Sequence, residues 1–222
     1  MTGGDASIFP AGVLDYTRSE GLNSPRLRWT ILDEQQRELG SAQLQGRGAA
    51  AKATSYLFGV GVGNGSQLAV FDAAGAVVLG VAARAQGRVT TVQVARGDGL
   101  QLGALVRRRS GFFRTVADIF SHAPATPFEL VSPPDGPVVG TVHQDDNTKD
   151  EMVVRDAAGN ELAQLERSRQ RSMHGPRPIV HHTYRLRLAP PAAAHPLRNL
   201  VIAVPLVHDL LMGPDRADGV FP

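Results

Sequence analysis

Near its carboxyl end the sequence reads Leu200-Val-Ile-Ala-Val-Pro-Leu-Val-His-Asp-Leu-Leu-Met212, and this stretch decides the fold. Residues 200–207 are apolar on every side of a helix, and such a helix must be buried all round or lie in lipid. The run is shorter than the ~20 residues that a membrane-spanning helix needs. It also contains Pro205, His208 and Asp209. One packed layer would bury only one stripe of this helix, so the rest of the chain must surround it.

The limits of this helix are marked at both ends. Pro196 suits the first helical position, and Gly213 followed by Pro214 is a strong stop signal. The sequence therefore predicts a helix from Pro196 to Met212, about 25 Å long at 1.5 Å per residue. Because Pro205 lies inside this range, we expect a kink or an early end there.

Five copies of one pattern precede the helix. Each copy is a run of alternating apolar residues, a polar turn and a second alternating run. Val, Leu and Ile at every second position are typical of strands, and Asp, Ser and Gly are typical of turns. Each copy is therefore predicted to be a β-hairpin. The copies start at Trp29, Leu68, Thr91, Phe128 and Met152, with turns near Gln36, Gly75, Gly99, Gly136 and Gly159.

Other segments complete the predicted strand set. Tyr56–Val62 leads through Asn64-Gly65 into the next apolar run, which is a strong short hairpin signal. Ile179–Leu188 is predicted to be a further strand, and Arg114–Ser121 a short helix. About a dozen strands around one apolar helix predict an all-β fold, a closed antiparallel barrel of about 12 strands with a central hydrophobic C-terminal helix.

The chain is expected to form one domain. Residues 25–213 are predicted to form the barrel, with a flexible lead-in over residues 1–24 and a tail over residues 214–222. The segment Met1–Gly12 has neither a basic region nor an apolar run, so it does not resemble a secretory signal. We therefore expect a cytoplasmic protein.

Composition excludes several classes of function. The 222 residues include no Cys, which rules out a disulfide framework, a thiol nucleophile and thiolate zinc sites. Only 5% of the residues are aromatic, which disfavours stacking platforms for single-stranded nucleic acid. The isoelectric point is about 9.4 although the net charge is only +2. Since the basic residues are almost all Arg, which stays protonated, this isoelectric point overstates the basic character, and no nucleic-acid partner is predicted.

An ordered set of motifs resembles a known family. The hairpins repeat a pattern similar to Val-x-Asp-x-x-Gly-x-x-x-Gly, Arg107-Arg-Arg-Ser-Gly follows a strand, Tyr184-Arg-Leu-Arg-Leu188 is the final strand, and the helix ends in Leu206–Met212. From about Trp29 to Met212 the chain resembles the tubby C-terminal superfamily. Within it, the chain looks most like the phospholipid scramblase and LURP-one-related branch.

The resemblance implies a tubby-like, 12-stranded barrel with a central helix and functions tied to membranes. These functions are phosphoinositide binding in tubby proteins and calcium-triggered lipid scrambling claimed for scramblases. The chain departs from scramblases in lacking a Cys-rich acylated segment. It also lacks carboxylates in Ala189–His195, just before the helix, where scramblases carry an acidic calcium loop. Lipid contact is therefore expected, and calcium-dependent scrambling is not.

The first candidate site is a basic and aromatic segment. Arg side chains attract anionic headgroups by roughly 1 kcal/mol each near a membrane surface. Phe side chains insert into the membrane interface. The alternative is that the Arg residues simply end a strand while both Phe residues pack against the barrel wall. The predicted lipid-binding residues are Arg107, Arg108, Arg109, Phe112, Phe113 and Arg114.

A second basic patch is formed by Arg167, Arg169, Arg171 and Arg177. The first three are spaced by two residues, which places them on one face of a strand. The alternative for this patch is an ordinary solvated face or loop without a ligand.

Other motifs favour structural roles. The glycines of Gly59–Gly65 are followed by a strand and not a helix, so a hairpin is favoured over a phosphate-binding loop. Asp145–Glu151 lacks the Gly and flanking helices of a paired-helix calcium loop, so a solvated loop is favoured. His208 and Asp209 are expected near the barrel mouth, with Asp209 hydrogen-bonded to loop backbone. Ordinary polar or half-buried positions are favoured for His174, His181 and His182.

These observations predict a non-enzymatic, scramblase-like module that binds anionic phospholipid or phosphoinositide peripherally, at the inner membrane surface. The alternative is a cytoplasmic protein-interaction or regulatory module without a lipid role. No nucleophile, acid–base pair or metal cluster is evident, so no catalytic residue, metal or cofactor is predicted. A protein partner is compatible with either function.

Overall fold

The computed structural model describes residues 8–19, 28–45, 67–86, 89–108, 128–133, 136–144, 150–174, 177–190, 192 and 195–212. The predicted strand Tyr56–Val62, its Asn64-Gly65 turn and the predicted helix Arg114–Ser121 lie outside these residues. The described elements are the strands β1 Val13–Ser19, β2 Arg28–Asp33, β3 Glu38–Gln45, β4 Gln67–Asp72, β5 Val77–Gln86, β6 Val89–Arg96, β7 Gln101–Arg108, β8 Phe128–Val131, β9 Val138–Gln144, β10 Glu151–Asp156, β11 Glu161–His174 and β12 Arg177–Leu188, and the helix α3 Arg198–Met212.

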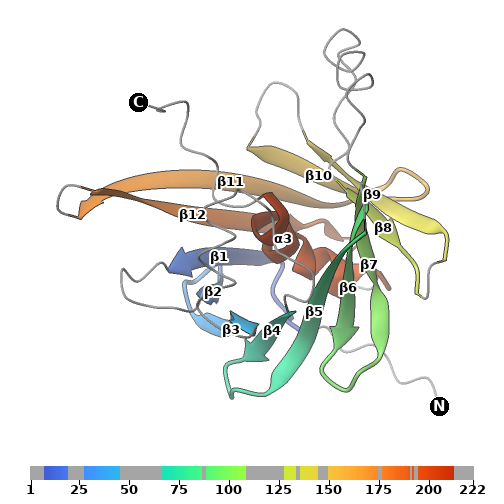
Figure 1. The fold of residues 1–222 in the computed structure, drawn as a ribbon, viewed down its shortest axis with the longest axis horizontal. Helices are drawn as coiled ribbons and strands as arrows, with labels where there is room; N and C mark the ends of the chain where they lie inside the picture. The colour runs from blue at the N-terminus through green and yellow to red at the C-terminus, as the bar shows by residue number, and fades with distance from the viewer. Residues whose placement is uncertain are drawn as a thin grey trace, which may run out of the picture.

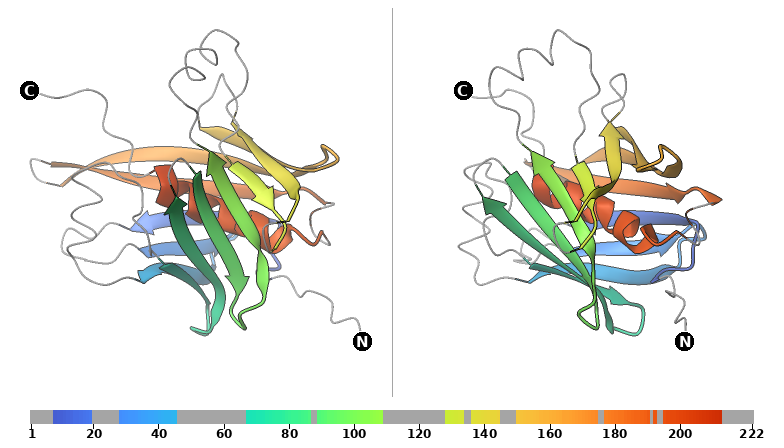
Figure 2. Two further views of the ribbon diagram at one scale, coloured as in Figure 1. Left: turned by 45° about the vertical axis from the view of Figure 1, so that its right-hand side comes forward. Right: turned by 90° about the vertical axis from the view of Figure 1, so that its right-hand side faces the viewer.

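The strands form a closed barrel around the helix. Each strand pairs antiparallel with its neighbours in sequence, and β1 closes the ring by pairing with both β12 and β2. Figures 1 and 2 show the strands arranged around α3, which runs through the barrel. The predicted all-β, closed antiparallel barrel with a central C-terminal helix is confirmed.

Four of the five predicted hairpins share one turn geometry. In β2–β3, the Asp33 N–H donates to the Arg37 carbonyl and the Gln36 N–H donates to the Asp33 carbonyl, both at 3.0 Å. The same pair of bonds recurs in the turns that begin at Asp72, Arg96 and Asp156. The third loop residue of each turn has positive φ, which is typical of a type I turn followed by a left-handed residue. These residues, Gln36, Gly75, Gly99 and Gly159, are the predicted turn positions.

The barrel begins earlier in the chain than predicted. β1 lies inside residues 1–24, where the sequence predicts a flexible lead-in, and it is the strand that closes the ring. The residues before it are also held, because Arg198 of the helix donates to the carbonyls of Phe9 and Ala11, each at 2.9 Å. Phe9 is buried in the core. The predicted start of the barrel at residue 25 is too late, because β1 has a weak sequence signal. Only two of its inward-facing side chains, Leu14 and Tyr16, are apolar.

Helix α3 is buried on every side. Residues 198–210 are all buried, including the charged Arg198 and Asp209. Burying each Leu, Ile or Val side chain stabilises the fold by about 1.5–3 kcal/mol, so this helix contributes substantially to the core. It is enclosed by the inward-facing residues of alternate strand positions, such as Trp29 and Ile31 of β2.

The helix continues through Pro205, so the expected early end is not observed. Pro205 has no N–H for the carbonyl four residues earlier, which leaves that turn of the helix weakened. The Tyr16 hydroxyl donates to the carbonyl of Ile202 at 2.8 Å within the same turn. This bond from the barrel wall, together with burial on all sides, holds the helix together across the proline. The helix begins at Arg198, two residues after the predicted start.

Gly103 of β7 lies close to the helix and to the neighbouring strand β8. Its φ is +148°, and a Cβ placed there would lie 2.6 Å from the Val131 carbonyl oxygen and 3.0 Å from Leu200 Cδ2. We predict that Gly103→Ala lowers the free energy of unfolding by about 1–3 kcal/mol, because backbone strain and a clash combine. Urea denaturation followed by circular dichroism measures the change.

Gly80 of β5 supplies the matched control, because a Cβ there meets nothing within 4 Å. Gly80→Ala is expected to leave stability unchanged or to raise it by about 0.5–1 kcal/mol, since it restricts the unfolded chain. Equal destabilisation by both substitutions would contradict the close approach at Gly103.

Candidate functional site

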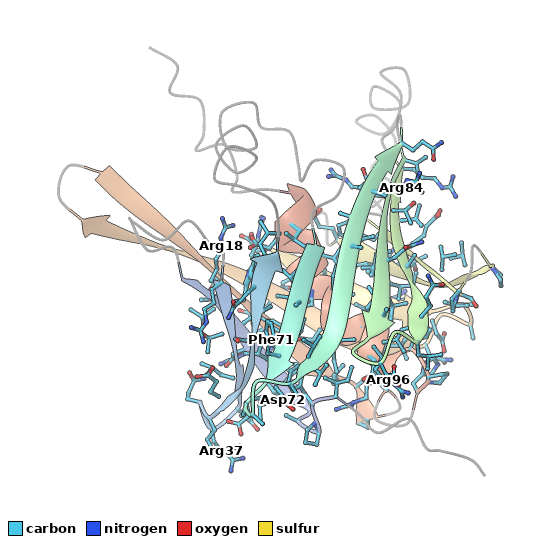
Figure 3. The ribbon with its side chains drawn as sticks, turned by 60° about the horizontal axis from the view of Figure 1, so that its bottom comes forward. Arg18, Arg37, Phe71, Asp72, Arg84 and Arg96 are labelled. Atoms are coloured by element: carbon cyan, nitrogen blue, oxygen red, sulfur yellow. The ribbon has the colours of Figure 1, made fainter. Side chains whose placement is uncertain are left out.

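The two ends of the barrel are chemically different. At one end, here called the turn rim, lie the tight turns of the five hairpins. At the other end, here called the helix-end rim, β1, β5, β7 and β11 end and the last turn of α3 lies between them. Figure 3 shows Arg18 and Arg84 toward the helix-end rim and Arg37, Asp72 and Arg96 at the turn rim.

The turn rim carries carboxylates that are part of the turns. Asp33, Asp72 and Asp156 each accept a hydrogen bond at 2.8 Å from the backbone N–H four residues later. Asp98 accepts from the Leu100 N–H at 3.1 Å. This is the local bonding that makes Asp favourable in turns. Turn chemistry therefore places these carboxylates at this end, where Asp33 and Asp98 also pair with Arg37 and Arg96.

The charge of Asp98 persists in acid. The hydrogen bond from the Arg96 guanidinium, with that from the Leu100 N–H, lowers the pKa of Asp98 to about 2. The pKa of Asp156 is also lowered, chiefly by the hydrogen bond from the Asn160 side chain. The carboxyl groups of Asp98 and Asp156 are therefore ionised at neutral pH.

The helix-end rim carries the first predicted basic patch. Arg107 and Arg108 are the last two residues of β7, so their side chains lie on opposite faces of the wall. Arg107 is half-buried and shares its face with the buried Leu105. Arg108 is exposed, and its Nε lies 3.1 Å from Glu129 Oε2. The predicted residues Arg109, Phe112, Phe113 and Arg114 lie outside the described residues.

Arg84 of β5 adds a basic residue that the sequence analysis missed. It is exposed and pairs across the sheet with Thr91, which in turn pairs with Val106 of β7. Arg84 and Arg108 therefore lie on the outer face of β5 and β7, with β6 between them, near the same rim. The two residues are 24 positions apart in sequence, so their proximity can be recognised only from the register of the hairpin strands.

Arg167 does not belong to an exposed patch. It shares an inward face with Ala163 and Leu165, it is buried, and its Nη2 lies 2.8 Å from Asp150 Oδ1. The assignment of Arg167 to the second basic patch is therefore not supported, because this side chain is buried. The spacing of two correctly places Arg167 on one face of β11, but that face turns toward the barrel interior. Arg169, Arg171 and Arg177 lie in β11 and β12, and their side chains are outside the described set.

A buried polar cluster surrounds the last turn of the helix. The carboxylate of Asp209 accepts from Arg18 of β1 at 3.2 Å, from Trp29 Nε1 of β2 at 2.8 Å and from the Tyr184 hydroxyl of β12 at 3.1 Å. Arg18 and Asp209 are each almost fully buried. A negative charge in the last turn of a helix opposes the helix dipole, so this carboxylate requires the cation beside it. The cluster anchors α3 to three strands.

The expected position of Asp209 needs correction. Side chains of three strands bind it, and the predicted loop backbone does not appear among its described partners. His208 is also buried, between the rings of Phe128 and Tyr184, with its Nδ1 3.3 Å from the Tyr184 hydroxyl. Arg18 faces inward with Leu14 and Tyr16, at every second position of β1. The sequence analysis missed it because a charged residue interrupts the apolar alternation by which an inward face is recognised.

The described residues hold no set of three or more His, Asp or Glu side chains arranged to bind a metal ion. Of the acidic segment Asp145–Glu151, only Asp150 and Glu151 are described, and Asp150 is paired with Arg167. The side chains of His174, His181 and His182 and the segment Gly59–Gly65 lie outside the described residues. In the described parts of the chain, no helix is both long and apolar enough to cross a membrane.

Comparisons with known proteins add little. No protein-family model matches the chain, and no curated protein matches it. One solved structure, an X-ray structure of a protein from Arabidopsis thaliana, is similar with 13% sequence identity and a TM-score of 0.45. The match covers 91% of this chain and 99% of that protein. The barrel and its helix are established by the strand pairing described above and not by this likeness.

The Arg18–Asp209 pair yields a stability prediction. We expect Asp209→Ala to lower the free energy of unfolding by about 3–5 kcal/mol, because it leaves a buried guanidinium without its carboxylate. Replacing both residues, as Arg18→Met with Asp209→Leu, should cost at least about 1.5 kcal/mol less than the sum of the single changes. Denaturant unfolding monitored by fluorescence of Trp29, the single Trp of the chain, measures both. Additive single effects would contradict the coupling.

We predict that the free energy of unfolding falls at alkaline pH, because two tyrosines are buried. Burial raises the pKa of Tyr16 and, together with the nearby Asp209 charge, the pKa of Tyr184. The folded state therefore favours the neutral phenols. Their contribution is complete below pH 10, the ordinary phenol value, and declines above it by about 1.4 kcal/mol per pH unit for each group. Unfolding free energies measured on both sides of pH 10 test this slope, and normal titration of both phenols in the native protein would contradict it.

Proposed function

We propose that this protein is a non-enzymatic, scramblase-like module of the tubby-like superfamily that binds anionic phospholipid or phosphoinositide peripherally through its helix-end rim. The observation that carries the proposal is a group of arginines near one rim. Arg84 and Arg108 are exposed and Arg107 is half-buried toward the helix-end rim. At the turn rim, Arg37 and Arg96 pair with Asp33 and Asp98, so that the charges there largely cancel. Cations gathered near one rim favour an approach to an anionic surface with the helix-end rim foremost.

The basic segment after β7 begins at this rim. Because β7 ends at Arg108, Arg109 and Arg114 follow from the basic end of the barrel, with Phe112 and Phe113 between them. Each Arg near an anionic membrane contributes about 1 kcal/mol, and the two Phe side chains supply the apolar contact that holds a peripheral protein at the interface. The ion pair with Glu129 reduces the contribution of Arg108 to the free energy of membrane binding.

The same arrangement supports a binding role at the inner, anionic leaflet. The Arg18–Asp209 cluster lies inside the barrel and is occupied in holding the helix, so we assign it a structural role. The resemblance to scramblases supports lipid as the ligand. Because Ala189–His195 carries no carboxylate, we propose binding without calcium-triggered scrambling.

A cytoplasmic protein-interaction or regulatory module is the second candidate function. It is favoured by the extension of β11 and β12 beyond the strands that flank them. Recovery of one stoichiometric protein partner by affinity capture, without any binding to anionic vesicles, would favour this function over the first.

Vesicle sedimentation tests the lipid proposal. We expect the protein to bind phosphatidylcholine vesicles that contain phosphatidylserine and to bind pure phosphatidylcholine much less. Arg107→Ala, Arg108→Ala and Arg109→Ala together should weaken binding by about 10- to 100-fold at low salt, the lower value reflecting the existing ion pair of Arg108. Failure to bind either vesicle at low salt would reject the proposal.

The turn rim provides the matched control. Arg37→Ala, Arg96→Ala and Arg155→Ala change the net charge by the same amount at the opposite end of the barrel. This triple variant should bind anionic vesicles like the unmodified protein. An equal loss of binding in both triple variants would show that net charge, and not the helix-end rim, governs attraction to the membrane.

A further inference from the structure

β11 and β12 extend beyond the barrel as a two-stranded ribbon. Residues 168–174 of β11 pair with residues 177–183 of β12 in continuous register, ending at His174 opposite Arg177. The pairing of β10 with β11 ends at Glu166, and that of β1 with β12 ends at Thr183. Among the described residues, therefore, the two strands of this ribbon pair only with each other. Figure 1 shows them projecting past the neighbouring strands.

The two edges of the ribbon differ. The β12 edge contains Pro178, which has no N–H to donate, and proline is a common way of blocking an edge strand. The β11 edge, Ser168–His174, contains no proline. Its length, about 24 Å at 3.4 Å per residue, matches an ordinary strand. The β11 edge is therefore the one that remains competent to pair.

The direction of its backbone groups follows from one hydrogen bond. The Arg167 N–H donates to the Asp150 carbonyl at 2.7 Å, toward β10. Since backbone groups alternate in direction along a strand, the N–H and carbonyl groups of Arg169, Arg171 and Met173 point toward the same edge. They continue the ladder past the point where its β10 partner ends.

The charge of this region defines the partner. From Ser168 to Thr183 the sequence contains no Asp or Glu. The same stretch contains the basic or titratable residues Arg169, Arg171, His174, Arg177, His181 and His182. An added strand rich in carboxylates therefore complements the net charge of the ribbon sequence.

We propose that the β11 edge of the ribbon binds an extended, acidic segment of a partner protein by β-strand addition. Main-chain hydrogen bonds to the edge supply affinity in this mode, and alternate side chains supply specificity. A membrane surface would satisfy the arginines but not the row of backbone N–H and carbonyl groups, so a peptide fits both features. The inference does not rest on lipid binding at the end of β7.

A labelled probe peptide tests the inference. The probe is a short peptide of alternating Glu and Val with blocked ends, and fluorescence anisotropy with the full-length protein reports its binding. Methylating its alternate backbone nitrogens preserves charge and side chains but removes donors to the edge. We expect the methylated probe to bind about tenfold more weakly or worse, and amide exchange at Arg169, Arg171 and Met173 to slow when the unmodified probe is bound.

Charge reversal in the ribbon gives the second arm. Arg169→Glu with Arg171→Glu should weaken binding of the unmodified probe by about tenfold or more, whereas Arg96→Glu with Arg155→Glu, the same charge change at the turn rim, should have less than about a twofold effect. Circular dichroism confirms that each variant is folded. Equal binding of the two probes rejects strand addition. No probe binding, with loss of phosphatidylserine vesicle binding in the ribbon variant alone, assigns the ribbon to the membrane and also overturns the inference.

Discussion

Helix α3 has no polar side over residues 200–207, and the need to exclude water from all of it is the constraint on which the rest of the structure depends. A single sheet cannot meet this need, whereas a closed ring of strands does. Closure depends on β1, which bridges β12 and β2. The same strand supplies Tyr16 and Arg18, which bind the helix backbone beside Pro205 and the carboxylate of Asp209. Enclosure and anchoring are therefore carried by one element.

Much of the fold can be predicted from the sequence because its signals are local. The five hairpins are visible as paired alternating runs, and four of their turns have positive φ at the predicted residue. The helix is visible because its run is apolar without a period. β1 is missed since Asp15 and Arg18 interrupt its pattern, and neither residue reveals in sequence that its partner is Arg185 or Asp209. Long-range pairing decides these roles, and a single sequence does not encode it visibly.

The candidate site is predicted less well for the same physical reason. Spacing shows that Arg107 and Arg108 lie on opposite faces of a strand and that Arg167 keeps one face of β11, but not which face meets water. Arg167 faces inward and is neutralised by Asp150, whereas Arg84 joins the outer wall near Arg108 through register alone. Binding to an anionic membrane depends on the net charge of the outward-facing side chains. A lipid-binding surface can therefore be recognised only when inward-facing and outward-facing positions are distinguished.

The join between β1 and β12 has a consequence for the order of folding. Arg18 and Asp209 are separated by 191 positions, and the strands beside them come from opposite ends of the chain. Contacts of such high sequence separation form slowly, because a long loop must close before they contribute. During synthesis on the ribosome, the hairpins form locally while the ring of strands is still open and α3 does not yet fill its interior. We therefore expect chaperone dependence to be greatest just before the last helix is released from the ribosome, when an open-edged curved sheet is exposed.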